Sequence, residues 1–177
     1  MSVLPPCTPT GKLLYRRDSR NLRTIAMVGA SANVARPSYF VLKYLSERGY
    51  TMFPVNPGLA GGEIHGRKVF ARLSDVPDPI DMVEIFRNSE AAGLIVDEAL
   101  QLSPLPKVIW MQLGIRNANA AERAEVLGVK VVMNRCPKIE FGRLSGEIGW
   151  AGVNSRVLSA KKPTVGVGFQ RLALGKP

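Results

Sequence analysis

The residues with the clearest chemical potential follow an apolar segment and lead into the next helix-like segment: Gly29, Ala30, Ser31, Arg36 and Ser38. Small residues at such a turn let a ligand approach the backbone closely. The N–H groups that open a helix lack intrahelical partners, and together with the helix dipole they favour an anion. Arg36 adds a positive charge that backbone amides lack. The spacing predicts a phosphate site, and the alternative interpretation is an ordinary tight turn with a solvated arginine.

Five apolar segments alternate with helix-like segments and predict the elements that position these residues. The expected strands are 24–30, 51–55, 80–86, 108–112 and 129–133. Helices are expected at 37–48, after a cap at Ser89, and from the capping-box pair Asn119 and Glu122 to Gly128. A short edge strand is expected within 68–73. This alternation predicts an α/β fold with a doubly wound, mainly parallel sheet and helices on both faces.

Ligands of such sheets bind beyond the carboxyl ends of the strands. The candidates at that edge are 29–31, Asn56, Pro57, Arg87, Gly114, Arg135 and Cys136. A dinucleotide site would need two further glycines after Gly29 and an acid at the end of the second strand, which instead ends in Val55 and Asn56. NAD is therefore not favoured. A P-loop is excluded because no Gly-Lys-Ser/Thr follows the first strand.

The length of 177 residues, with 46% hydrophobic content, suits one domain with a sizeable core. We expect a flexible lead over 1–11, a single domain over 12–145 that begins with a short basic helix at 12–22, and a C-terminal extension or tail over 146–177. Apolar runs are far shorter than the ~20 residues that span a bilayer, and no secretory segment is evident. A cytoplasmic protein without membrane contact is expected, and its two cysteines do not indicate a disulfide framework.

The net charge of +10 favours an anionic partner such as a phosphorylated cofactor, an acidic membrane or nucleic acid. Part of the excess lies near the two ends of the chain. Nucleic acid is the less favoured partner, because no nucleic-acid motif and no basic face interleaved with aromatic residues is evident. A protein partner or a homo-oligomer is left open.

A series of motifs runs in order along the chain: 28–31 with 36–38, 49–50, 54–57, 80–81, 85–87, 110–115 and 131–136. Together they resemble the small bacterial CoA-binding proteins, which consist of little more than the N-terminal CoA-binding domain of the succinyl-CoA synthetase alpha subunit. The resemblance covers about residues 14–145. It implies a Rossmann-like fold and coenzyme A as the ligand.

The resemblance also implies a set of ligand contacts. The CoA phosphates would contact Gly29, Ala30, Ser31 and Arg36, with Ser38 near the helix start. The nucleotide side would be lined by Val55, Asn56 and Pro57, and the pantetheine arm by Phe86, Arg87, Gln112, Gly114 and Ile115. The synthetase uses a phosphorylated histidine from a second domain that has no counterpart in this sequence. The expected function is therefore binding of CoA or an acyl-CoA without catalysis.

Two other functions remain as alternatives. One is a CoA-dependent enzyme or redox-linked protein that uses Cys136, although a buried inert thiol is the simpler interpretation. The other is a basic module that binds nucleic acid or protein. The single histidine, His65, is expected in a surface loop, and Trp110 in the core. No metal site is expected, because Asp75, Asp78 and Asp81 have the positions of turn and strand-end residues.

Overall fold

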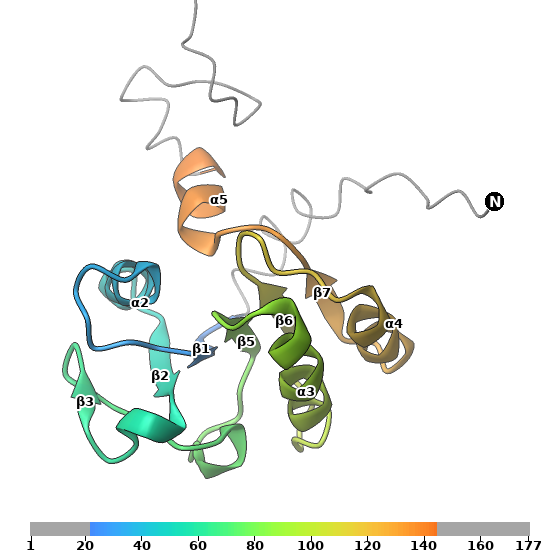
Figure 1. The fold of residues 1–177 in the computed structure, drawn as a ribbon, viewed down its shortest axis with the longest axis horizontal. Helices are drawn as coiled ribbons and strands as arrows, with labels where there is room; N and C mark the ends of the chain where they lie inside the picture. The colour runs from blue at the N-terminus through green and yellow to red at the C-terminus, as the bar shows by residue number, and fades with distance from the viewer. Residues whose placement is uncertain (1–21, 145–177) are drawn as a thin grey trace, which may run out of the picture. The chain divides into compact units, whose positions relative to one another are not determined.

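A computed structural model of the chain describes residues 22–144 (Figure 1). The expected lead over 1–11, nearly all of the expected basic helix over 12–22 and the expected extension over 146–177 lie outside the described residues. The chain divides into two units after Phe141, and the site described below lies wholly within the first.

Five parallel strands form the central sheet: β1 (Thr24–Val28), β2 (Thr51–Val55), β5 (Met82–Ile85), β6 (Val108–Met111) and β7 (Lys130–Val132). Their order is β2-β1-β5-β6-β7, so the direction of winding reverses between β1 and β5. The predicted doubly wound parallel sheet is confirmed, although β1 ends before Gly29. That residue and Ala30 continue the apolar run but already belong to the loop after the strand.

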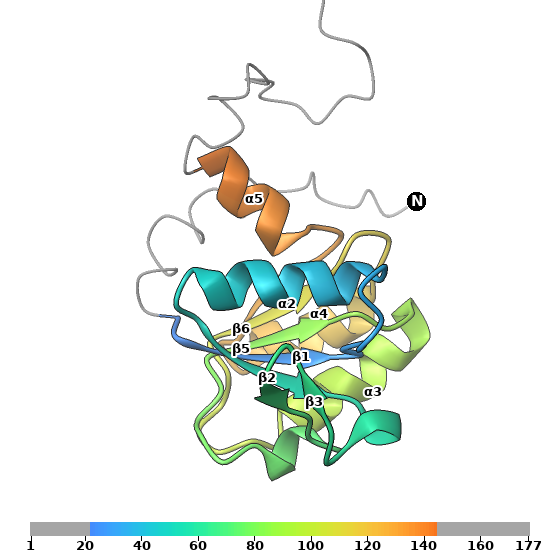
Figure 2. The same cartoon turned by 90° about the vertical axis from the view of Figure 1, so that its left-hand side faces the viewer.

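Helices cover both faces of the sheet (Figure 2). One face carries α2 (Pro37–Glu47) and the first residues of α5 (Pro137–Leu144), and the other carries α3 (Ser89–Ala99) and α4 (Ala118–Val126). Along β5 the side chains alternate between the two faces: Val83 and Ile85 pack with α3 and α4, whereas Met82 packs on the α2 side. Each face thus has its own apolar cluster, as parallel strands buried on both sides require.

Two helix caps differ from the prediction. Asn88, not Ser89, caps α3 by accepting a hydrogen bond from the Ala91 N–H at 2.8 Å. Asn117 caps α4 by accepting from the Ala120 N–H at 3.0 Å, so the expected capping box at Asn119 is wrong. In both cases an asparagine outside the helix supplies the acceptor, which is a strong preference at this position.

The segment between β2 and β5 differs most from the prediction. It contains two short 3-10 turns (Pro57–Leu59 and Leu73–Asp75) and a small hairpin of β3 (Glu63–Ile64) and β4 (Arg67–Lys68). The edge strand expected at 68–73 is wrong, because only Phe70 bridges to the main sheet, beside Val55. The exposed His65 lies in the turn of the hairpin, with a φ of 51°.

Two further sequence expectations concern the core and the membrane. Trp110 is 4% exposed, and its indole N–H donates to the Arg135 carbonyl at 2.7 Å, so its expected place in the core is confirmed. None of the helices in the described part of the chain has the length and apolar character that a bilayer crossing needs.

Candidate functional site

The loop after β1 approaches the loop after β5 so closely that a side chain would not fit between them. Gly29 has a φ of +87°, and its N–H donates to the Val55 carbonyl at 2.9 Å. A Cβ built on Gly29 would lie 2.7 Å from the Phe86 carbonyl oxygen and 2.9 Å from Cδ of Arg87. Both the backbone conformation and the space therefore require glycine here.

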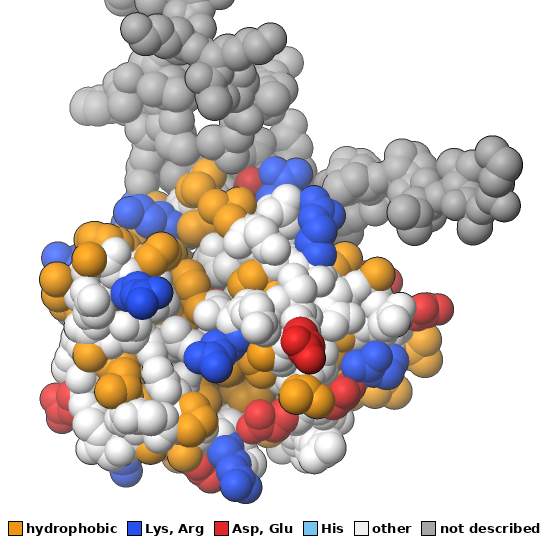
Figure 3. Space-filling view, in the orientation of Figure 1, with side chains coloured by type: hydrophobic (Ala, Val, Ile, Leu, Met, Phe, Trp, Pro, Cys, Tyr) orange, Lys and Arg blue, Asp and Glu red, His pale blue; other side chains and the backbone are white. Residues whose placement is uncertain are grey.

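A cleft of about 370 Å³ opens at the carboxyl ends of β1 and β2. It is lined by Val28, Gly29, Val55, Asn56, Pro57, Gly58, Ala71, Arg87, Ala91, Leu94, Ile95 and Glu98. Figure 3 views this edge of the sheet and shows hydrophobic, basic and acidic side chains around a central hollow. The cleft thus combines an apolar lining with one arginine, one glutamate (Glu98) and backbone groups, and mostly apolar clefts with a few polar groups are typical of small-ligand sites.

Asn56 fixes the end of β2 to the loop after β1. Its side-chain amide donates to the Ala30 carbonyl at 2.8 Å, and its side-chain oxygen accepts from the Gly58 N–H at 3.0 Å. The residue stands near the place where a dinucleotide site carries an acid for the ribose. A neutral amide at this position, unlike an acid, would not repel a phosphate group of a bound ligand.

Of the thirteen residues expected from the resemblance, the structure brings five to the cleft: Gly29, Val55, Asn56, Pro57 and Arg87. The remaining phosphate-loop residues are not part of its lining. Ser31 accepts a hydrogen bond from the Asn33 N–H at 3.2 Å, Arg36 is exposed directly before α2, and Ser38 is buried in the first turn. Ala30 is fully buried, and its carbonyl accepts the hydrogen bond from the Asn56 side chain.

Of the five residues expected along a pantetheine arm, only Arg87 lines this cleft. Phe86 packs on the α2 side of the sheet, and the buried Ile115 packs on the α3 side. Gly114 is exposed, and its N–H donates to Oδ1 of Asn134 at 2.7 Å. Gln112 is buried, with its amide turned into the protein. In the loop after β6, the exposed groups that could contact a ligand are therefore Gly114 and the Leu113 side chain rather than Gln112 or Ile115.

Sequence reasoning missed two features, one at this edge and one inside the sheet. The first is the wall that α3 contributes to the cleft, where Leu94 is 74% exposed and lies outside the buried stripe of the helix. The second is Glu84, a fully buried carboxyl in the centre of the sheet. Burial raises its pKa to about 8, and the hydrogen bond from Gln112 opposes this rise only in part. The sequence did carry a signal for this group, since Glu84 is a charged residue within an otherwise apolar strand segment.

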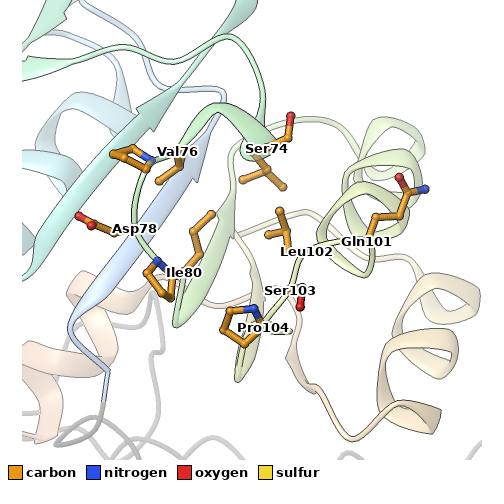
Figure 4. Close-up of a pocket in the computed structure, with 11 residues that line it drawn as sticks. Ser74, Val76, Asp78, Ile80, Gln101, Leu102, Ser103 and Pro104 are labelled. Carbon is orange, nitrogen blue, oxygen red and sulfur yellow. The ribbon is translucent and has the colours of Figure 1, made fainter.

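A second cavity, of about 320 Å³, lies at the opposite end of the strands, between the turn before β5 and the segment after α3 (Figure 4). Its lining includes Ser74, Asp78, Gln101 and Ser103 but neither lysine nor arginine. This composition does not favour an anion. Within residues 22–144, no three His, Cys, Asp or Glu side chains are grouped to hold a metal ion.

Comparison with known proteins identifies the class of this domain. Residues 23–142 match the CoA binding domain family, and the chain belongs to that family. The uncharacterized protein YneT of Bacillus subtilis is 34% identical over 128 residues, which span 72% of this chain and 89% of that protein. The alpha subunit of ADP-forming acetate–CoA ligase I from Pyrococcus furiosus is 34% identical over 87 residues, 46% of this chain and 18% of the subunit.

A solved structure from Thermus thermophilus, cell-free ID.343, is similar at 35% sequence identity with a TM-score of 0.71. The match covers 76% of this chain and 98% of that one. The predicted resemblance to CoA-binding domains and the predicted fold class are therefore both confirmed.

Proposed function

We propose that this protein binds coenzyme A or an acyl-CoA at the carboxyl edge of the sheet and performs no chemistry of its own. The observation that carries the proposal is the cleft, which gathers Gly29, Asn56 and Arg87 from three separate loops. Membership of the CoA binding domain family supports the choice of ligand. The glycine at position 29 lets the loop after β5 approach closely, and this approach places Arg87 next to the loop proposed to hold the phosphates.

The parts of the ligand correspond to different parts of the edge. The phosphates would bind at the 29–31 backbone and the start of α2, with Arg36 beside them. The apolar wall formed by Val28, Val55 and Ile95 suits the flat face of an adenine ring. The pantetheine arm would then pass along the loop that contains Gly114 and Ile115.

The first prediction concerns ligand choice and Arg36. Calorimetry should show micromolar or tighter binding of CoA, weaker binding of dephospho-CoA and no measurable binding of NAD. Arg36→Ala should weaken CoA binding by roughly tenfold, the effect of losing about 1.4 kcal/mol of charge-assisted contact. Arg23→Ala is the matched control, because Arg23 is also exposed but precedes β1 at the opposite edge of the sheet. Equal effects of the two changes would exclude Arg36 as a phosphate ligand, and preferential binding of NAD would contradict the proposed function.

A second prediction concerns Arg87, the arginine that lines the cleft. Arg87→Ala should weaken CoA binding by about 10- to 100-fold, because a charged hydrogen bond contributes roughly 1.5–3 kcal/mol. Arg87→Lys should recover part of the loss if charge is what matters. CoA titrations at low and high salt test this further: the Kd of Arg87→Ala should depend less on salt concentration than the Kd of the wild type. An unchanged salt dependence would show that Arg87 contacts no phosphate.

A further inference from the structure

Glu84 is the one carboxyl among the fully buried side chains of the described core. It lies on β5 in register with Met27 of β1 and Trp110 of β6, two buried apolar neighbours. Its Oε1 accepts a hydrogen bond from Nε2 of Gln112 at 2.7 Å, whereas its buried Oε2 has no hydrogen-bond partner. A buried carboxyl with so little compensation destabilises the fold, which raises the question of what it does there.

Gln112 connects this carboxyl to two loops at the carboxyl edge. Its Nε2 donates to Glu84 and also lies 3.7 Å from Sγ of Cys136, in the segment that leads into α5. Its side-chain oxygen accepts from the Leu113 N–H at 3.2 Å. All polar groups of the Gln112 side chain are thus engaged, and their partners fix which end of the amide faces which neighbour.

The same two loops are also joined directly to each other. The Gly114 N–H donates to Oδ1 of Asn134 at 2.7 Å, and the Asn134 N–H donates to the Ile115 carbonyl at 3.2 Å. Asn134 holds a φ of 57°, in the left-handed region that asparagine adopts more readily than most other non-glycine residues. Gln112 is hydrogen-bonded to Leu113 in one of these loops and contacts Cys136 in the other, so a shift of Gln112 would change both loops.

We propose that Glu84 is a positioning residue: through Gln112 it holds the loop 113–115 against the segment before α5, in the arrangement that receives the distal arm of the ligand. The identity of that ligand rests on the proposed function. The positioning role itself concerns the protein alone and is measurable without a ligand. It explains why a carboxyl is retained in an apolar strand, since a leucine there would offer Gln112 no acceptor.

Ionisation of Glu84 is the means of disturbing this arrangement without a mutation. A fully buried carboxylate with one hydrogen bond must gain water to be stable in its charged form. Only Ile85 follows Glu84 in β5, so the nearest source of water is the carboxyl edge of the sheet, where Gln112 lies. The described titratable or charged side chains on the elements that cover the α2 face are Tyr39, Lys43, Tyr44 and Glu47 of α2, Arg48 at its C-cap, Arg135 and Cys136 before α5, and Lys138 and Glu140 of α5. Arg48 lies over the Tyr44 ring at 3.9 Å, and Arg135 pairs with Glu140 at 3.6 Å. Burial and the Gln112 hydrogen bond set the pKa of Glu84.

The test compares amide hydrogen exchange in the ligand-free full chain between about pH 6 and about pH 9, with intrinsic exchange rates divided out. The Leu113 and Gly114 amides report on the loop. The Leu127 and Gly128 amides, which donate to α4 carbonyls, serve as an internal reference. We expect protection at the loop amides to fall by about tenfold relative to the reference as pH rises through the pKa. Glu84→Gln should remove this fall, and the exposed control Glu122→Gln should retain it.

CoA titrations over the same pH range extend the test to the ligand. The ratio of the wild-type Kd to the E84Q Kd should rise with pH, since the titration of CoA itself cancels in that ratio. Loop protection that follows the reference amides in the wild type, or that falls equally in E84Q, would overturn the positioning role. If CoA bound at no pH, the proposed function would fail, and the exchange measurement would still decide the role of Glu84 separately.

Discussion

Glu84→Gln should abolish a loss of stability that the wild-type protein suffers as the pH rises from about 4.5 to about 8. The folded protein holds the proton on Glu84 up to a pKa of about 8, compared with an ordinary value of 4.5. A shift of this size corresponds to roughly 3–5 kcal/mol between the two ends of the range. This is the largest electrostatic effect expected from any group whose pKa is displaced in the described part of the chain.

The sign follows from the raised pKa of this carboxyl. Below about pH 4.5 both the folded and the unfolded chain carry the proton, so Glu84 adds no pH dependence. Between the two pKa values only the folded state binds the proton, and the free energy of unfolding falls with each unit of pH. Above about pH 8 the loss is complete. A glutamine keeps the size of the side chain and an acceptor for Gln112 but cannot titrate.

Urea denaturation at about pH 5, 6.5 and 8 measures this effect as the difference between the variant and the wild type. The difference should grow with pH in favour of E84Q, whatever constant offset the substitution itself introduces. Glu122→Gln, on the exposed side of α4, should follow the wild type throughout. Parallel stability curves for E84Q and the wild type would mean that Glu84 is not held neutral in the folded protein.

The sequence was sufficient for the sheet because parallel strands buried on both faces are continuous apolar runs. Residues 51–55 coincide with β2, and Pro54 is accommodated because β2 is an edge strand of the sheet. Local hydrogen bonding was harder to predict. Both Asn88 and Ser89 are good capping residues, and only the conformation of the backbone decides between them.

The candidate site, too, could be predicted from the sequence only in part. Topology alone places Gly29, Asn56 and Arg87 at one edge, since each follows a strand and the carboxyl ends of parallel strands meet there. The direction of a side chain is not fixed by topology. Gln112 stands at that edge but turns inward to Glu84, a partner 28 residues away on the neighbouring strand. Such a long-range hydrogen bond leaves no periodic signal in the sequence.

Gly29→Ala should destabilise the protein by roughly 2–4 kcal/mol and weaken CoA binding at the same time. Two separate effects contribute. An alanine at a φ of +87° is in the left-handed region, which costs about 1 kcal/mol or more for a residue with a Cβ. The added Cβ would also lie 2.7 Å from the Phe86 carbonyl oxygen, a backbone atom that can move only with the end of β5.

Gly49→Ala separates these effects, because Gly49 has nearly the same φ, +85°, and no atom lies within 4 Å of its added Cβ. Gly49 lies just after the C-terminal end of α2, whereas the loop after β1 leads into the N-terminal end of that helix. The Gly49 N–H donates to the Ser46 carbonyl. This variant should lose only the roughly 1 kcal/mol of the backbone term and should bind CoA normally. Urea denaturation measures the stability of both variants, and calorimetry measures their CoA binding.

Because the two glycines are matched in φ, the excess destabilisation of Gly29→Ala reports the close approach of the loops after β1 and β5. Equal losses would show that the loop after β1 can move away from Phe86, and a site that depends on this close approach would then be ruled out.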